Sequence, residues 1–251
     1  MGGNVCIQKK AIASSRPTIH LYLPLTTTQP TNILTRRKMH YTTLLTTTLL
    51  SLATAYPTRR TTGTSKGFNL RVNLTDTTRD LTPSVQNLYL SDLRTGAGTA
   101  ISVLTSTPPT NPFYLNGTAY HTTVTHDIPS VYPLSIVIPP ASSSDPFYPG
   151  EHAIVTAVSG GTELFLRAGE PILFPLLGDE NGVYAACSRD VVLGGEKTTI
   201  LTARYVYGNE TVPADCAPVE FVVECAVLPE LPEGSSWNHD YAFDVPCVTM
   251  A

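Results

Sequence analysis

Between Gly67 and Thr75, every second position of the chain is apolar. The apolar positions of this first run are Phe68, Leu70, Val72 and Leu74. A period of two places such residues on one face of a strand and their polar neighbours on the other. The pattern therefore predicts a half-buried strand over 67–75, with Asn73 on its polar face.

Shorter runs rich in β-branched and aromatic residues predict further strands. They span 85–90, 99–104, 119–125, 134–138, 152–158, 163–167, 183–187, 198–207 and 219–228. No window of about a dozen residues carries the i, i+3, i+4, i+7 spacing of an amphipathic helix. The elements expected from the pattern are therefore strands throughout.

Glycine, proline and asparagine separate these runs. Asn181-Gly182 is the strongest signal for a two-residue hairpin, and Gly194-Gly195 marks another tight turn. Short strands with frequent turns are typical of sandwiches and barrels. We expect an all-β fold: a single-domain antiparallel β-sandwich or barrel over 67–251, with a disulfide-tethered C-terminal tail.

The N-terminal part has a different pattern. Residues 39–55 follow three basic residues, are mostly apolar, and close on Ala53-Thr54-Ala55. These are the parts of a secretory signal peptide. A transmembrane helix would need about twenty apolar residues. A transit peptide stays open because 1–55 lack acidic residues, although the small-residue cleavage site argues against it.

The flanking segments have no hydrophobic period. Residues 1–38 are interpreted as a disordered or spurious N-terminal extension, and 56–66 as a polar linker before the β domain. The protein is thus expected to be secreted and extracellular.

Removal of 1–55 would change the charge. The chain has 16 basic and 20 acidic residues, and 1–55 carry six of the basic ones and none of the acidic ones. A net charge near −10 would remain, which repels phosphate backbones and anionic lipid heads. We expect no nucleic-acid partner and no membrane association after signal cleavage. The oligomeric state is left open.

Four cysteines follow residue 55, namely Cys187, Cys216, Cys225 and Cys247. An even number in an oxidising compartment predicts two disulfides, and all three pairings are possible. The sequence contains no C-x-x-C motif, so the cysteines do not indicate a metal site. Three Asn-x-Thr triplets predict surface glycosylation, at Asn73, Asn116 and Asn209.

No catalytic motif is present: no G-x-S-x-G, no H-E-x-x-H and no phosphate-binding glycine loop. We therefore predict no catalytic, cofactor-binding or metal-ligating residue. His126-Asp127 is interpreted as a loop before Pro129. His121 and His126 would point to opposite faces of a strand. Residues 178–182 offer clustered oxygen ligands for Ca²⁺, but a solvated β-turn is the favoured interpretation.

Two regions could contact a ligand. Residues 139–151 form a long, proline-rich loop that carries Phe147 and Tyr148, a plausible binding loop or an exposed variable insertion. Trp237, the single tryptophan, could stack on a sugar ring or plug the core, and the second role is favoured.

Several segments resemble a known family. They are SKGFNLRVNLT (65–75), DLTPSVQNLYL (80–90), TGAG (95–98), YAAC (184–187) and the region around Cys216 and Cys225. The chain resembles small secreted proteins of filamentous ascomycete fungi that carry an uncharacterised conserved domain of unknown function. The resemblance implies a fungal secreted setting and one domain, and it transfers no functional residue.

We expect a non-enzymatic protein that binds a glycan or a surface protein at the cell wall or a host surface. The alternative is a secreted hydrolase whose residues converge only in the fold. That alternative predicts a deep pocket in which carboxylates, or a histidine with an aspartate, lie within hydrogen-bond reach.

Overall fold

The computed structural model describes residues 61–118, 122–128, 132–158, 160–167, 170–175, 177 and 181–249. Within these ranges the secondary structure is strand apart from one 3₁₀ turn, η1 (Thr77–Arg79), which confirms the all-β prediction. The strands are β1 (Thr61–Ser65), β2 (Gly67–Leu74), β3 (Tyr89–Gly96), β4 (Thr99–Thr105), β5 (Phe113–Gly117), β6 (Thr122–Ile128), β7 (Tyr132–Val137), β8 (His152–Ala153), β9 (Val155–Ala157), β10 (Leu164–Leu166), β11 (Ile172–Pro175), β12 (Gly182–Leu193), β13 (Glu196–Tyr207), β14 (Cys216–Ala226) and β15 (Val245–Thr249). A search of the described residues finds no helix long and apolar enough to cross a membrane.

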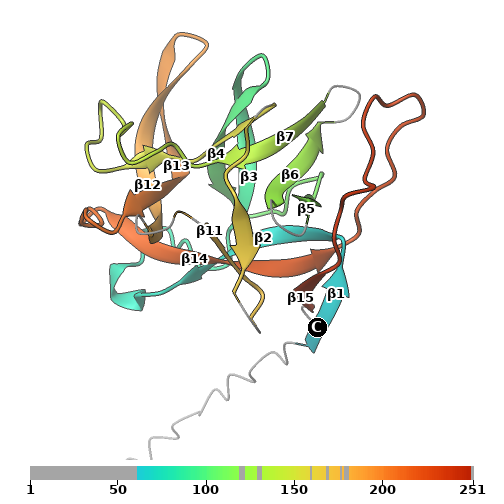
Figure 1. The fold of residues 1–251 in the computed structure, drawn as a ribbon. Coiled ribbons are helices and arrows are strands. Elements are labelled where there is room, and N and C mark those ends of the chain that lie inside the picture. Colours follow the sequence, from blue (N-terminus) through green and yellow to red (C-terminus); the bar gives the residue numbers. More distant parts are fainter. Residues whose placement is uncertain are drawn as a thin grey trace, which may run out of the picture. The chain divides into compact units, whose positions relative to one another are not determined.

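The strand pairings close on themselves. One circuit runs β2-β3-β4-β9-β7-β6-β5 and returns to β2, and a second runs β2-β14-β12-β13-β4-β3. The two circuits share β2, β3 and β4. Figure 1 shows β14 and β2 side by side beneath β12, β13, β4 and β3. Of the two predicted architectures, these pairings favour the barrel.

Strand β2 is buried on both faces. Phe68, Leu70 and Val72 lie in the main core, as their alternation predicts. The opposite face was predicted to be exposed, yet Asn69 and Arg71 are buried as well. Arg71 Nε lies 3.0 Å from Glu224 Oε2 on the paired strand β14. The polar alternation of β2 therefore reflects buried ion pairing rather than contact with solvent.

The pattern missed four strands: β1, β5, β11 and β15. Part of the predicted linker 56–66 is strand β1, which pairs along its whole length with β15. β1 consists of threonine, serine and glycine and has no apolar period, so nothing local marks it. Its order comes from a partner far away in the chain.

A two-residue hairpin at Gly194-Gly195 joins β12 to β13, and both of its residues have positive φ (60° and 91°). Those angles fit the twist of antiparallel strands and need glycine. The hairpin predicted at Asn181-Gly182 is wrong. Gly182 is the first residue of β12, and a Cβ there would lie 1.9 Å from the Val206 carbonyl oxygen. A close approach between strands requires this glycine.

The disulfides are Cys187–Cys216 and Cys225–Cys247. The first joins directly opposed residues of β12 and β14. The second joins β14 to β15, and so tethers the C-terminal tail as predicted. Between Cys225 and Cys247 the tail also bonds to β5 beyond the residues that β2 covers, where Phe243 N donates to Leu115 O at 3.0 Å.

Candidate functional site

Residues 139–151, which we call the braced loop, connect β7 to β8. Its backbone is held at both ends. Tyr207 Oη donates to Pro139 O at 2.7 Å, and Asp145 N donates to Glu151 O at 2.9 Å. Figure 1 shows the loop beside β12 and β13. The loop is therefore fixed to β13 at its start and closed on itself at its end, while several of its residues between these points are exposed.

Two buried ion pairs fix the loop from beneath. Arg189 on β12 donates to both oxygens of the Glu151 carboxylate, with Nε 2.9 Å from Oε2 and Nη2 2.5 Å from Oε1. Arg204 on β13 donates to Asp145 Oδ2 at 2.6 Å. Both arginines and Glu151 are buried. Bidentate guanidinium–carboxylate pairs define orientation as well as distance.

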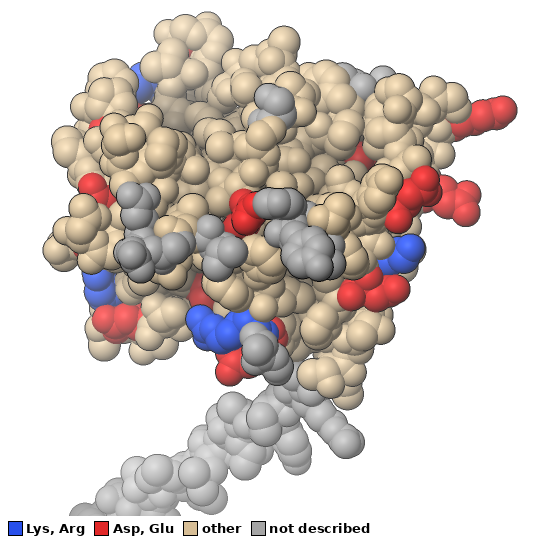
Figure 2. Space-filling model, viewed as in Figure 1, with Lys and Arg blue, Asp and Glu red and all other residues tan. Residues whose placement is uncertain are grey.

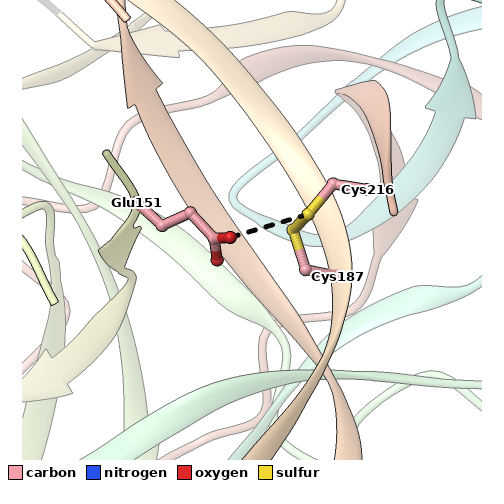
Figure 3. Close-up of side chains that lie close together, drawn as sticks. All are labelled: Glu151, Cys187 and Cys216. Carbon is pink, nitrogen blue, oxygen red and sulfur yellow. Dashed lines mark hydrogen bonds between the residues drawn. A yellow bond between two sulfur atoms is a disulfide. The ribbon is translucent and has the colours of Figure 1, made fainter. Parts of the chain in front are cut away.

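Glu151 also lies against the Cys187–Cys216 disulfide (Figure 3). Its Oε1 is 3.9 Å from Cys216 Sγ. These three residues are close enough together to suggest metal ligands. The two sulfur atoms are bonded to each other, however, and the carboxylate is held by Arg189. In this oxidised state the cluster anchors the loop to the sheet.

Tyr148, predicted to contact a ligand, is used internally. Its ring centroid lies 4.6 Å from the Arg189 guanidinium carbon and 5.5 Å from that of Arg204. Its hydroxyl accepts a hydrogen bond from Asp190 N at 3.0 Å. The ring therefore serves as a cation–π platform within the brace.

Phe147, the neighbouring predicted residue, points the other way. Its side chain is 85% exposed, although its backbone N–H donates to Asp145 Oδ1 at 2.9 Å. The brace thus holds an aromatic side chain in solvent on a backbone that cannot easily move.

The stabilising contribution of the Arg204–Asp145 pair is expected to be lost in acid. Burial alone would raise the pKa of the Asp145 carboxyl, but hydrogen bonds from Arg204 and Phe147 N outweigh burial and hold the pKa below its ordinary 3.8. A depressed pKa adds stability that is complete above the ordinary value and is lost as the pH falls through the folded-state value. We expect the stability difference between wild type and Asp145→Asn to shrink over the acidic range below the ordinary pKa of 3.8. Urea unfolding across this range measures it, and a constant difference would contradict the assignment.

The three predicted glycosylation positions differ in exposure. Asn73 is half-buried, and its Nδ2 donates to Glu220 Oε1 at 2.9 Å. Asn116 is half-buried within β5. Asn209 is exposed in the turn after β13. Of the three, Asn209 is the position whose amide is most open to a glycan.

The interpretation of His126-Asp127 as a loop is wrong: both residues lie in β6 and are buried. Asp127 accepts hydrogen bonds from Tyr114 Oη and Trp237 Nε1, each at 3.1 Å, and its Oδ2 lies 2.7 Å from His239 Nε2. Trp237 and His239 thereby attach the C-terminal segment to β6. Trp237 itself is half-buried, and its role as a plug on the core stays a prediction.

His126 has a different partner, Asp92 on β3, to which its Nε2 is ion-paired. The two residues line a cleft of about 250 Å³ together with Arg94, Asn111 and Phe113. This is the histidine–aspartate contact that the hydrolase alternative predicts. Within the described part of the chain, no hydroxyl or thiol hydrogen-bonds to His126. Sequence analysis missed the pair because Asp92 and His126 sit on strands that do not pair with each other.

Some predicted features lie outside the described residues. They are His121, most of 178–182, and the signal peptide with its flanking extension.

Comparison with known proteins supports the resemblance noted in the sequence. The chain is 31% identical over 198 residues to the "Antigenic protein SchS34" of Stachybotrys chartarum, an alignment that covers 73% of this chain and 86% of the relative. No solved structure matches the chain. A family model matches residues 65–225, the part of the chain that runs from β1 into β14. The chain therefore belongs to the family described as Domain of unknown function (DUF7907), which confirms the predicted membership of an uncharacterised fungal domain family.

Proposed function

We propose that this protein is exported and binds a glycan or a protein at the cell wall or a host surface through the braced loop. The observation that carries the proposal is Phe147, an aromatic side chain 85% exposed on a loop fixed by buried ion pairs. The proposed role is binding, without turnover.

Rigidity is what distinguishes this phenylalanine from an ordinary exposed one. Binding costs conformational entropy when a contacting loop must become ordered, and a loop already fixed avoids much of that cost. Exposed aromatic side chains dominate many binding energies because they bury a large area with few rotatable bonds. A phenyl ring of this kind fits an apolar pocket of a protein or the face of a sugar ring.

The charge distribution supports a partner other than nucleic acid. On the face shown in Figure 2, acidic side chains gather on the side where the C-terminal segment lies in Figure 1. Each arginine within the described ranges bonds to a carboxylate, a carbonyl or a hydroxyl, which leaves little free positive charge. Phosphate backbones need clusters of free cations.

Export is supported by the two disulfides, which persist in oxidising compartments. The description of the Stachybotrys relative as antigenic is compatible with a protein presented outside the cell.

The test compares the binding of wild type and of Phe147→Ala to candidate partners. We expect saturable binding of wild type to one fraction of a panel of wall polysaccharides and surface proteins, and binding at least about tenfold weaker for the variant. The protein should be secreted from a fungal host, and its deglycosylated mass should correspond to a chain beginning near Tyr56. Affinity is measured by interferometry on immobilised fractions.

Tyr241→Ala is the matched control, because Tyr241 is also exposed but lies on the C-terminal segment. Binding that is equally weakened by both substitutions, or absent for wild type across the panel, would count against the proposal. Turnover of esters or glycosides that disappears in His126→Gln would instead favour the hydrolase, because a histidine with a carboxylate can act as a base and its orienting acid.

A further inference from the structure

We infer that the cleft beside Asp92 and His126 is a binding site for one neutral sugar ring or a similarly small polyhydroxylated molecule. This site is separate from the braced loop, and the inference does not depend on the proposed function.

The cleft exists because β2 changes partners. Its first residues pair with β5 (Gly67↔Tyr114, Phe68↔Phe113), and Arg71 pairs with Tyr89 on β3. Between these pairings β3 and β5 separate, and the cleft is lined from both sides: Asp92 and Arg94 from β3, Asn111 and Phe113 from β5 and the segment before it.

Asp92 and His126 face the inside of the barrel. Residues opposite each other in register share a face of the sheet. His126 is opposite Phe113, which is in turn opposite the core residue Phe68. Asp92 follows Leu90, another core residue, by two positions on β3. Their side chains thus form a polar patch at the edge of an apolar core.

This patch has hydrogen-bonding capacity that the described residues do not use. Asp92 Oδ2 is paired with His126, but Asp92 Oδ1 is buried and has no hydrogen-bond partner among them. Ser102, directly opposite Asp92 on β4, is fully buried, and its Oγ likewise has no such partner. Buried polar atoms are nearly always hydrogen-bonded. A ligand hydroxyl in the cleft would donate to Asp92 Oδ1 once a side chain of the cleft wall shifts and exposes this atom.

Charge balance in the cleft favours a neutral ligand. The Asp92 carboxylate and the Arg94 guanidinium line the cleft with opposite charges, and Arg94 Nη2 donates to Tyr132 Oη at 3.1 Å and retains other N–H groups. Asn111 adds an amide that can both donate and accept. A sugar ring offers hydroxyls of both capacities and carries no charge that one of these side chains would oppose.

The size of the cleft limits the ligand. At about 250 Å³ it is smaller than the roughly 300–1,000 Å³ typical of pockets for drug-sized molecules. One sugar ring suits this volume, and a longer chain would have to extend into solvent.

The experiment titrates glucose, mannose and N-acetylglucosamine, each to about 50 mM, into ¹⁵N-labelled protein and follows amide shifts; weak sites have Kd values near 1 mM. We expect saturable shifts on β3, β5 and β6 for at least one sugar. Asp92→Asn should weaken binding at least tenfold, because it removes the carboxylate acceptor while keeping its size.

A second variant separates binding from folding. Asn111 lies on the cleft wall outside the buried ion pair, so Asn111→Ala should weaken binding while the protein still folds. This variant therefore tests the site even if Asp92→Asn unfolds. Phe147→Ala should leave these titrations unchanged, so failure here is distinguishable from failure of the braced loop to bind. The inference is overturned if no sugar produces saturable shifts, if the shifts lie away from the cleft, or if both cleft variants bind like wild type.

Discussion

Replacing Arg189 by alanine is expected to lower the free energy of unfolding by about 3–5 kcal/mol. Arg189 neutralises Glu151, which is 2% exposed beside the Cys187–Cys216 disulfide. Its loss leaves a buried carboxylate without its bidentate partner and removes one of the two guanidinium groups that lie over the Tyr148 ring. Equilibrium urea unfolding followed by circular dichroism measures the change.

Lys197→Ala is the control for this prediction. Lys197 forms an ion pair with Asp190 at 2.7 Å but is 71% exposed, so solvent screens the pair and its removal should lower the free energy of unfolding far less than removal of Arg189. The double variant Arg189→Met/Glu151→Leu should be more stable than Arg189→Ala, because it leaves no buried charge unpaired. Equal effects of the Arg189 and Lys197 substitutions would show that burial of the pair is not what matters.

Removing the Cys225–Cys247 disulfide, as the double serine variant, is expected to cost about 3 kcal/mol and to loosen β1 and β15 together. The bridge closes a sequence separation of 22 residues and holds β15 on β14, and β1 pairs only with β15 among the described strands. Native-state hydrogen exchange should show protection lost at the β1 and β15 amides, alongside a lower urea midpoint.

The same variant should keep the braced loop, whose anchors are Glu151, Arg189 and the other disulfide. Phe147-dependent binding therefore serves as the internal reference. Unchanged protection of β1 would mean that the β14–β15 pairing holds this edge without the covalent link.

Local pattern identified the strands whose own residues alternate. The run from Phe68 to Leu74 predicts β2, and the runs within β12 and β13 predict those strands similarly clearly. β12 and β13 extend beyond the predicted ranges. β1 and β15 could not be found in this way. Thr61–Ser65 has no apolar residue, and it becomes a strand because β15 supplies its hydrogen-bond partners.

The candidate sites follow the same division. Phe147 was visible from sequence as an aromatic residue in a long loop, but the roles of its neighbours were not. Tyr148 looks equivalent to Phe147 until Arg189 and Arg204 are placed on its ring. His126 on β6 reaches Asp92 on β3 although these two strands do not pair with each other. No spacing along the chain encodes such a contact.

The closed circuits of the barrel bear on when the molecule can fold during its synthesis. Strand β2 emerges early, but its longest partner is β14, and the contacting residues Asn73 and Glu220 are 147 positions apart. Contacts of such high sequence separation form slowly, because the intervening chain must be closed first. Until β14 has been made, the edge of β2 that it covers is an unpaired strand edge, the kind of surface that promotes association between incomplete chains. Asn69, Arg71 and Asn73 make β2 less apolar during the time before β14 covers its edge.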